Sequence, residues 1–360
     1  ALMGLDIGTT GCKASIFTPE GELCAYSYQE YQTLHPKPGR FELNPEKVWQ
    51  SVKKVIKKAV HNNEEEAVTA LCASSFGEAG VPLNRKGEIL HNSILYTDER
   101  GSNHCQSLIE QLGLEKIMKI TGLRAHPMYT INKVMWIKEN LPRLYEKIWK
   151  IMLFEDFILF RLGGEIGIDY SLASGTMAFK ITEKSWSREL LTAAAIKKDI
   201  FSPPLPSGSV LGTIKSDLAS ELDLSPRVKL VTGGHDQACA AVGGGIFAEG
   251  TAIDSIGTVE CITPALNQPL LNENMLEYNF ACAPHAREDM YVAYAFNFTG
   301  GSLLKWYRDN FARLFKKQAQ EKGKSVYDIL NDRAASEPTS LLVLPHFAGA
   351  GTPYMDTSAT

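Results

Sequence analysis

The stretch from Leu230 to Ile262 constrains the chain most, because it joins two strand-like runs through glycine turns that carry charged side chains. An apolar run around residues 228–231 leads into Gly233-Gly234, His235 and Asp236. A carboxylate that follows a strand and a glycine turn can point into a cleft, where it is well placed to act as a general base. The alternative is that Asp236 only caps the next helix and that His235 is an ordinary turn residue.

The first residues of the chain have a similar arrangement. Residues 2–17 alternate as strand, glycine turn and strand, which predicts a hairpin. Its turn, Gly8-Thr9-Thr10-Gly11, has the composition of a phosphate-binding turn, because glycine lets the backbone approach a ligand and threonine hydroxyls donate to oxygens. Lys13 adds positive charge, and Asp6 is suited to hold a hydrated magnesium ion. The alternative here is a plain hairpin with a Thr-Gly turn.

Two more acidic residues follow predicted strands. Glu78 lies among small residues after a strand over 68–74, and Asp98 follows a short strand over 94–96. Both positions suit a side chain that faces a ligand, although a solvated loop charge is the commoner role for such a residue.

Strands with glycine turns alternate with helices, and this order occurs twice along the chain. It predicts an α/β architecture with two lobes and a cleft between them. Asn44 and Pro45 predict the start of a helix that continues to residue 60, because asparagine is a good cap and proline suits the first helical position. The pattern also predicts a helix over 303–315 and a last strand over 341–344.

Glycine and threonine recur at corresponding places in the two halves, at 8–10 and at Gly257-Thr258. One such turn is weak evidence of function. A pair of them, each between two strands, predicts two phosphate-binding turns that face each other across the cleft.

Composition narrows the class of protein. The chain has 360 residues, is 44% hydrophobic and 22% charged, and has a formal net charge of -4. Neither nucleic-acid nor membrane binding is expected from these values, and no apolar run is long enough to span a bilayer. The seven cysteines contain no CxxC pair, which favours a reducing, cytoplasmic location and argues against a structural zinc site.

Several motifs together resemble the FGGY family of carbohydrate kinases, which belongs to the actin, Hsp70 and sugar-kinase superfamily. The most specific match is residues 128–140, MYTINKVMWIKEN, which is similar to the family's N-terminal signature. The other similar segments are Asp6–Thr10 with Lys13, Asp98 with Arg100, Asp169–Ser174, Gly234–Asp236, Ile256–Thr258, Gly300-Gly301 with Trp306, and Thr352–Tyr354.

The resemblance implies a two-lobed ribonuclease H-like fold with a central cleft. It implies an N-terminal domain over 1–243 and the start of a C-terminal domain over 244–360, with the second lobe incomplete because family members continue into an adenosine-binding motif. It also implies ATP-dependent phosphorylation of a sugar or polyol, with Mg²⁺ as cofactor. The implied roles are catalytic base for Asp236, sugar binding for Glu78, Asp98 and His235, phosphate binding for Gly8, Thr9, Thr10, Lys13, Gly257 and Thr258, and metal binding for Asp6.

Two departures from the family pattern concern the substrate and the second phosphate turn. Val259-Glu260 stands where many members have Ser-Gly, which places a carboxylate near the expected phosphates. Glu78 falls where glycerol kinases have a substrate-binding glutamate, but the arginine that precedes it there is Gly77 in this chain.

A neutral ketopentose or polyol of xylulose type is the expected substrate, because carboxylates accept hydrogen bonds from hydroxyls and repel an anionic sugar. Gluconate or glycerol is the alternative within the family, and homodimerisation is a further expectation. The alternative from another class is a nucleotide-binding regulator or chaperone-type ATPase on the same fold, without sugar chemistry.

Overall fold

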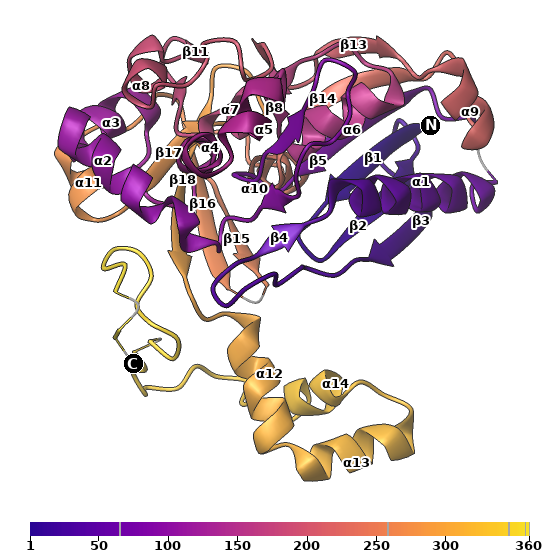
Figure 1. Ribbon diagram of the computed structural model, residues 1–360. Coiled ribbons are helices and arrows are strands. Elements are labelled where there is room, and N and C mark those ends of the chain that lie inside the picture. The colour runs from indigo at the N-terminus through magenta and orange to yellow at the C-terminus, as the bar shows by residue number, and fades with distance from the viewer. Residues whose placement is uncertain (65, 258, 345, 357, 360) are drawn as a thin grey trace.

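The computed structural model describes residues 1–360 except 65, 258, 345, 357 and 360, and two larger β-sheets with helices around them dominate the fold (Figure 1). The first sheet has six strands in the order β13-β14-β5-β1-β2-β3, and the second has four in the order β15-β16-β18-β17. The strands of these two sheets are β1 Leu2–Ile7, β2 Gly11–Phe17, β3 Leu23–Glu30, β5 Ala70–Ser75, β13 Val210–Thr213, β14 Lys229–His235, β15 Ala252–Ile256, β16 Glu260–Leu266, β17 Ala281–Pro284 and β18 Tyr291–Asn297.

Short strand pairs and helices make up most of the remaining structure. The short pairs are β4 Glu42–Leu43 with β7 Ser93–Ile94, β6 Val81–Leu83 with β8 Lys150–Met152, β9 Ile168–Asp169 with β12 Pro204–Leu205, and β10 Phe179–Lys180 with β11 Ser185–Trp186. The helices are α1 Pro45–His61, the 3₁₀ helix η1 Glu99–Gly101, α2 Ser102–Leu112, α3 Leu114–Thr121, α4 Thr130–Asn140, α5 Pro142–Lys147, α6 Phe154–Leu162, α7 Tyr170–Ser174, α8 Arg188–Ala193, α9 Ser216–Glu221, α10 Asp236–Gly243, α11 Glu273–Glu277, α12 Gly301–Asn310, α13 Arg313–Lys322 and α14 Val326–Asn331.

The start of the chain folds as its sequence predicts. β1 and β2 form an antiparallel hairpin in which Met3, Leu5 and Ile7 are buried, as the alternation of the strand requires. The side chain of Asn44 caps α1 by accepting hydrogen bonds from two backbone N–H groups, at 3.0 and 3.1 Å, and Pro45 occupies the first turn. The predicted hairpin and the predicted start of this helix are confirmed.

Three parallel strands bring distant parts of the sequence to one edge of the first sheet. β5 lies between β1 and β14 and is parallel to both. In this register Asp6 is opposite Ser74, and Ser74 is opposite Gly234. The carboxyl ends of such strands are where α/β proteins usually bind their ligands.

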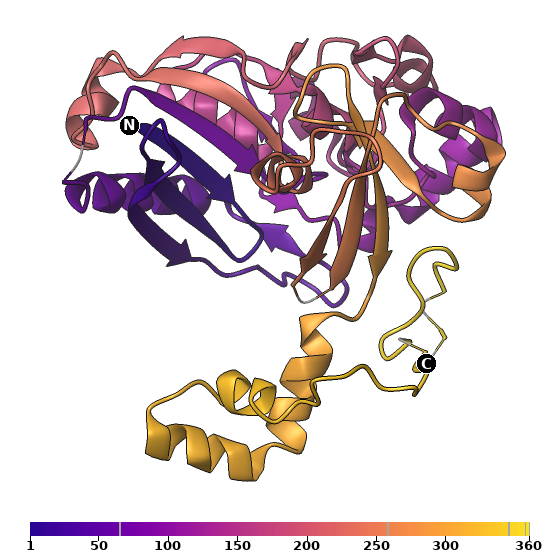
Figure 2. The same cartoon turned by 180° about the vertical axis from the view of Figure 1, so that it is seen from behind.

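The second sheet packs against the first half of the chain. α10 lies between the two sheets (Figure 2), where Ala241 contacts a small apolar cluster that includes Ala265 and Met290. A larger buried cluster contains side chains from both halves, including Leu172 of α7 and Cys282 of β17. These contacts hold the lobes together behind the edge where the three parallel strands end.

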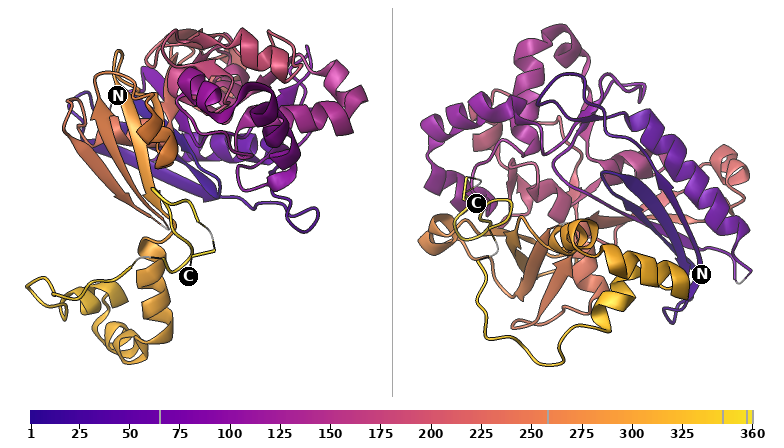
Figure 3. Two further views of the ribbon diagram at one scale, coloured as in Figure 1. Left: turned by 90° about the vertical axis from the view of Figure 1, so that its left-hand side faces the viewer. Right: turned by 90° about the horizontal axis from the view of Figure 1, so that it is seen from below.

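Helices α12–α14 extend away from both sheets as an arm (Figure 3). The sequence predicts one helix over 303–315, but the structure has two, since α12 ends at Asn310 and α13 begins at Arg313. The predicted strand over Leu341–Leu344 is wrong: these residues have no regular structure, and their exposed fractions range from 67% to 99%. Among the helices of the described residues, none is both long and apolar enough to cross a bilayer.

Candidate active site

A cavity of about 540 Å³ lies between the two lobes, at the carboxyl ends of β1, β5 and β14. Residues of β16 and β18, among them Cys261 and Tyr294, form its opposite wall. The structure brings together most of the site residues that the sequence predicts, because the cavity is lined by Asp6, Gly8, Thr9, Thr10, Lys13, Glu78, His235 and Asp236.

Asp236 is the first residue of α10, and His235 ends β14 and caps the helix. The backbone N–H of Gln237 donates to Asp236 Oδ1 over 2.7 Å, and His235 Nδ1 lies 2.9 Å from the same oxygen. Burial acts to raise the pKa of Asp236, but the charge and hydrogen bond of His235 outweigh it and hold that pKa below its ordinary value. Asp236 is therefore ionised at neutral pH, as a general base must be.

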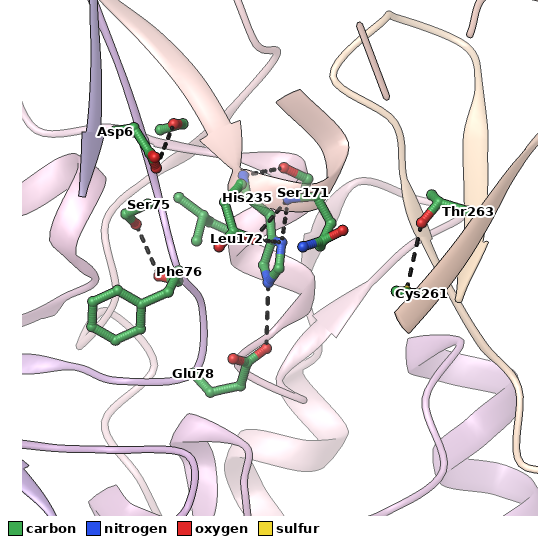
Figure 4. Close-up of polar contacts among 12 residues, drawn as sticks. Asp6, Ser75, Phe76, Glu78, Ser171, Leu172, His235, Cys261 and Thr263 are labelled. Carbon is green, nitrogen blue, oxygen red and sulfur yellow. Dashed lines mark hydrogen bonds and ion pairs between the residues drawn. The ribbon is translucent and has the colours of Figure 1, made fainter. Parts of the chain in front are cut away.

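His235 lies between two carboxyl groups, and Figure 4 shows its contact with that of Glu78. Its Nδ1 contacts Asp236, and its Nε2 lies 3.8 Å from Glu78 Oε1. Burial acts to lower the pKa of His235, but the charge of Asp236, the hydrogen bond to it and the charge of Glu78 raise that pKa to about 9.

A second contact of His235 is incompatible with this charged form. The N–H of Gln237 also lies 3.2 Å from His235 Nδ1, an arrangement that needs an unprotonated nitrogen. The ion pair between His235 and Asp236 is the better interaction, because it is shorter. The N–H of Gln237 does not need His235 as an acceptor, since it already donates to Asp236 Oδ1.

Glu78 is held over the cavity by the helix that carries the family signature. Its backbone has a φ of 66°, and its carbonyl oxygen accepts hydrogen bonds from Thr130 Oγ1 at 3.0 Å and from Lys133 Nζ at 3.2 Å. Burial raises the pKa of Glu78, although the charges of His235 and Lys133 oppose this effect. Lys133 is buried as well, and burial lowers its pKa to about 7. Thr130 and Lys133 of the signature segment therefore hold the backbone turn that carries Glu78, a role that the sequence pattern does not reveal.

Asp98 does not line the cavity. It is only 1% exposed, and its carboxylate accepts hydrogen bonds from Phe41 N at 2.7 Å and from the guanidinium of Arg100 at 2.7 and 2.8 Å. Arg100 also pairs with Glu42 and stacks over Trp136. The sequence predicts that Asp98 binds the sugar, but in the structure its carboxylate is taken up by these contacts away from the cavity. The cavity is reached instead by Tyr96, an aromatic residue just before Asp98 that sequence analysis did not select.

The turn between β1 and β2 is tight, and it faces the cavity. The N–H of Gly8 donates to Gly11 O over 2.9 Å, and a side chain at Gly11 would come within 2.6 Å of Tyr28 Oη. Lys13 Nζ lies 2.8 Å from Asp6 Oδ2, so the two charged residues are paired at the end of β1.

A magnesium site would have few protein ligands. Within the described residues, no group of three or more His, Cys, Asp or Glu side chains gathers in a way that could hold a metal ion. Asp6 and Asp236 line the same cavity, however, and Mg²⁺ bound to a nucleotide keeps several waters and needs only one or two carboxylates. The donor set therefore fits a hydrated magnesium ion that arrives with phosphate oxygens.

The second glycine turn lies against the start of α12. The N–H of Gly301 donates to Gly257 O over 2.7 Å, and a side chain at Gly300 would come within 2.6 Å of the carbonyl carbon of Val259. Val259 lines the cavity, whereas Gly257 and Glu260 do not, and the predicted phosphate ligand Thr258 lies outside the described residues.

Comparisons with known proteins identify the family of the chain. The profile of the FGGY family of carbohydrate kinases, N-terminal domain, matches residues 1–243, and that of the C-terminal domain matches residues 252–360. The chain is 28% identical over 359 residues to a xylulose kinase of Bacillus subtilis, covering 99% of this chain and 70% of the relative. It is 26% identical over 355 residues to a gluconokinase of Bacillus licheniformis, covering 98% and 68% respectively.

A solved structure shows the same fold. The crystal structure of a ligand-bound xylulose kinase from Lactobacillus acidophilus superimposes with a TM-score of 0.85, covering 99% of this chain and 70% of that one at 24% identity. The predicted two-lobed sugar-kinase fold is therefore confirmed. Because both family profiles match and together span most of the sequence, the chain belongs to the FGGY family of carbohydrate kinases, enzymes that transfer a phosphoryl group to an alcohol.

Proposed function

We propose that the protein transfers the γ-phosphate of ATP to a hydroxyl of a neutral sugar or polyol, most readily a ketopentose such as xylulose. The observation that carries this proposal is the charge distribution in the cavity. Among the described residues that line it, the cationic ones are Lys13 and His235, and each already pairs with a carboxylate at 2.8 or 2.9 Å. A substrate carboxylate would find no unpaired cation there, whereas hydroxyl groups would find acceptors.

Asp236 is the proposed catalytic base. Its Oδ1 is occupied by the N–H of Gln237 and by His235, which leaves Oδ2 to take the proton of the attacking hydroxyl. A base in this position contributes about 10²- to 10⁴-fold to the rate. The sugar oxygen then attacks the γ-phosphorus, the bond from that phosphorus to the bridging oxygen of ADP breaks, and the proton remains on Asp236 until it leaves to solvent.

Glu78 and His235 are the proposed sugar ligands. Glu78 accepts hydrogen bonds from sugar hydroxyls, and the imidazolium of His235 lies between it and the base. Asp98, which lies outside the cavity, is proposed to act indirectly by holding the loop that carries Tyr96.

The nucleotide phosphates are proposed to bind where the two lobes meet. Gly8, Thr9, Thr10 and Lys13, which line the cavity, would donate from the N-terminal domain over 1–243. Gly257 and Thr258 would donate from the C-terminal domain over 244–360, a proposal that rests on their resemblance to the second phosphate motif of the family. Asp6 would hold the hydrated Mg²⁺, which neutralises phosphate charge when it is bound. Positioning and charge neutralisation supply most of the catalysis in phosphoryl transfer, so these groups matter as much as the base.

An aldonate such as gluconate is the second candidate, favoured by relatives that are named gluconokinase. A panel of ketoses, polyols and aldonates, assayed by ADP release, separates the two. We expect turnover with a neutral ketose or polyol, and we expect Glu78→Gln to raise the KM for that substrate more than it lowers kcat. Activity confined to aldonates would refute the proposed substrate class, while loss of all activity in Asp236→Asn would still support the proposed base.

A further inference from the structure

The turn that presents Asp236 follows an irregularity in β14. The register between β14 and β5 shifts between Thr232 and Gly234, which is a β-bulge. A bulge takes a backbone N–H out of the strand ladder, and that group then needs another partner because it is buried. Bulges next to active sites commonly re-aim a side chain.

Buried side chains satisfy the backbone of this turn. The N–H of Gly233 donates to Glu155 Oε1 over 2.8 Å. The N–H of His235 donates to Ser171 Oγ over 2.8 Å, a contact that Figure 4 shows. Ser171 in turn donates its hydroxyl hydrogen to Asp169 Oδ2 over 2.6 Å. Glu155 and Asp169 are both fully buried, although carboxyl groups are rarely placed in a protein interior.

The two glycines of the turn make this close approach possible. A side chain at Gly233 would come within 2.1 Å of Ala73 O, and one at Gly234 would come within 2.8 Å of Ser171 Oγ. Any other residue would push the turn away from the groups that hold it. Asp236 Oδ1 contacts only its neighbours in sequence, the N–H of Gln237 and the ring of His235. The position of the Asp236 carboxylate therefore depends on where the backbone of this turn is held.

We propose that Glu155, Ser171 and Asp169 are positioning residues for catalysis, which hold the bulged turn so that Asp236 faces the attacking hydroxyl. Glu155 fixes the turn two residues before the end of β14, and the pair of Ser171 and Asp169 fixes its last residue. The inference rests on the proposed role of Asp236 as base. It concerns how the base is held and is independent of which sugar is phosphorylated.

Burial, together with the nearby carboxyls of Asp169 and Asp156, raises the pKa of Glu155 well above its ordinary value. Glutamine at this position would keep the shape of the side chain and an oxygen that can accept the N–H of Gly233. Methionine would match its volume but would leave the N–H of Gly233 without an acceptor.

Ser171→Ala has a matched control in this chain. Ser202 is also fully buried, and it also donates to a buried carboxyl group over 2.6 Å, that of Asp156. Both substitutions remove a buried hydrogen bond to a carboxyl group, but Ser171→Ala also removes the acceptor for the N–H of His235. Both should lower thermal stability, whereas only Ser171→Ala should lower activity.

The experiment measures kcat and KM for sugar and ATP in Ser171→Ala, Ser202→Ala, Glu155→Gln and Glu155→Met of the whole protein. We expect Ser171→Ala to lower kcat by about 10- to 100-fold with little change in either KM, since a shift of about 1 Å at a reacting group can cost 10²-fold. Ser202→Ala should keep its kcat, and Glu155→Gln should lose less kcat than Glu155→Met. If Ser171→Ala fails to fold, the comparison of Glu155→Gln with Glu155→Met provides the test.

Three results would overturn the inference. A wild-type kcat in Ser171→Ala and in Glu155→Met would show that the turn needs no such support. A raised sugar KM with unchanged kcat would make Ser171 a direct sugar ligand, since it also lines the cavity. Equal losses of kcat in Ser171→Ala and Ser202→Ala would show that the loss comes from a general destabilisation of the protein. Failure of the proposed base is separate, because Asp236→Asn would then remain active.

Discussion

Replacement of His235 by asparagine should make the free energy of unfolding depend less on pH. The imidazolium lies 2.9 Å from Asp236 and 3.8 Å from Glu78, and its side chain is 18% exposed, so solvent screens these contacts only in part. The ordinary pKa of 6.5 rises to about 9 in the folded protein. Since one pKa unit corresponds to about 1.4 kcal/mol, the charged form of His235 stabilises the fold by at most about 3.5 kcal/mol, less the part that solvent screens.

The sign of the pH dependence follows from the raised pKa. The stabilisation is present in full below the unfolded-state pKa, near 6.5, and is lost as the pH rises through about 9. Asparagine has no charge to lose, and it is itself a favoured residue at the N-cap position that His235 occupies. The difference in stability between wild type and His235→Asn should therefore be largest at about pH 6 and should shrink towards about pH 10.

Urea unfolding of both proteins across this pH range measures the difference directly. The slope of unfolding free energy against urea should be the same for both proteins, since the substitution leaves the buried surface almost unchanged. A stability difference that stays constant between about pH 6 and pH 10 would refute the assignment of a charged His235 between the two carboxyl groups.

Two further predictions concern the site. Asp236→Asn should lower kcat by about 10²- to 10⁴-fold while the sugar dissociation constant, measured by calorimetry, changes little; near-normal turnover would exclude Asp236 as the base. Lys13→Met should raise the KM for ATP more than the KM for sugar, because it removes a charge beside the Gly8–Thr10 turn and leaves Asp6 unpaired. A change confined to the sugar KM would place phosphate binding elsewhere.

Local signals made much of the fold predictable. A capping asparagine and a proline set the start of α1, and alternating burial sets β1, because both depend on residues that are neighbours in sequence. The turn with His235 and Asp236 is predictable for the same reason, since a glycine pair after a strand is visible without a structure. The identity of His235 as the cap of α10, with Asp236 one residue inside the helix, needed the structure.

Tertiary partners decided the features that the sequence did not predict. Glu78 and Asp98 both follow strands, yet only Glu78 faces the cavity. Asp98 is buried, and its carboxylate pairs with Arg100 and accepts the backbone N–H of Phe41. Residues 341–344 have the composition of a strand, but a strand forms only where another strand supplies hydrogen bonds. The positioning role of Ser171 depends on a register shift in β14, which no local pattern reports.

The place of β14 in the first sheet also determines when that sheet can be completed during synthesis. β5 can pair with β1 as soon as both have been synthesised, because both are early in the chain. Its other neighbour is β14, so Ala70 can pair with Lys229 only after about 160 more residues have been translated. Until then β5 is an open edge, although Leu71 within it is destined for full burial. Such non-local pairing is slow and leaves apolar edges exposed to other chains. While the segment between these two strands is being translated, the exposed edge of β5 is therefore open to pairing with other chains.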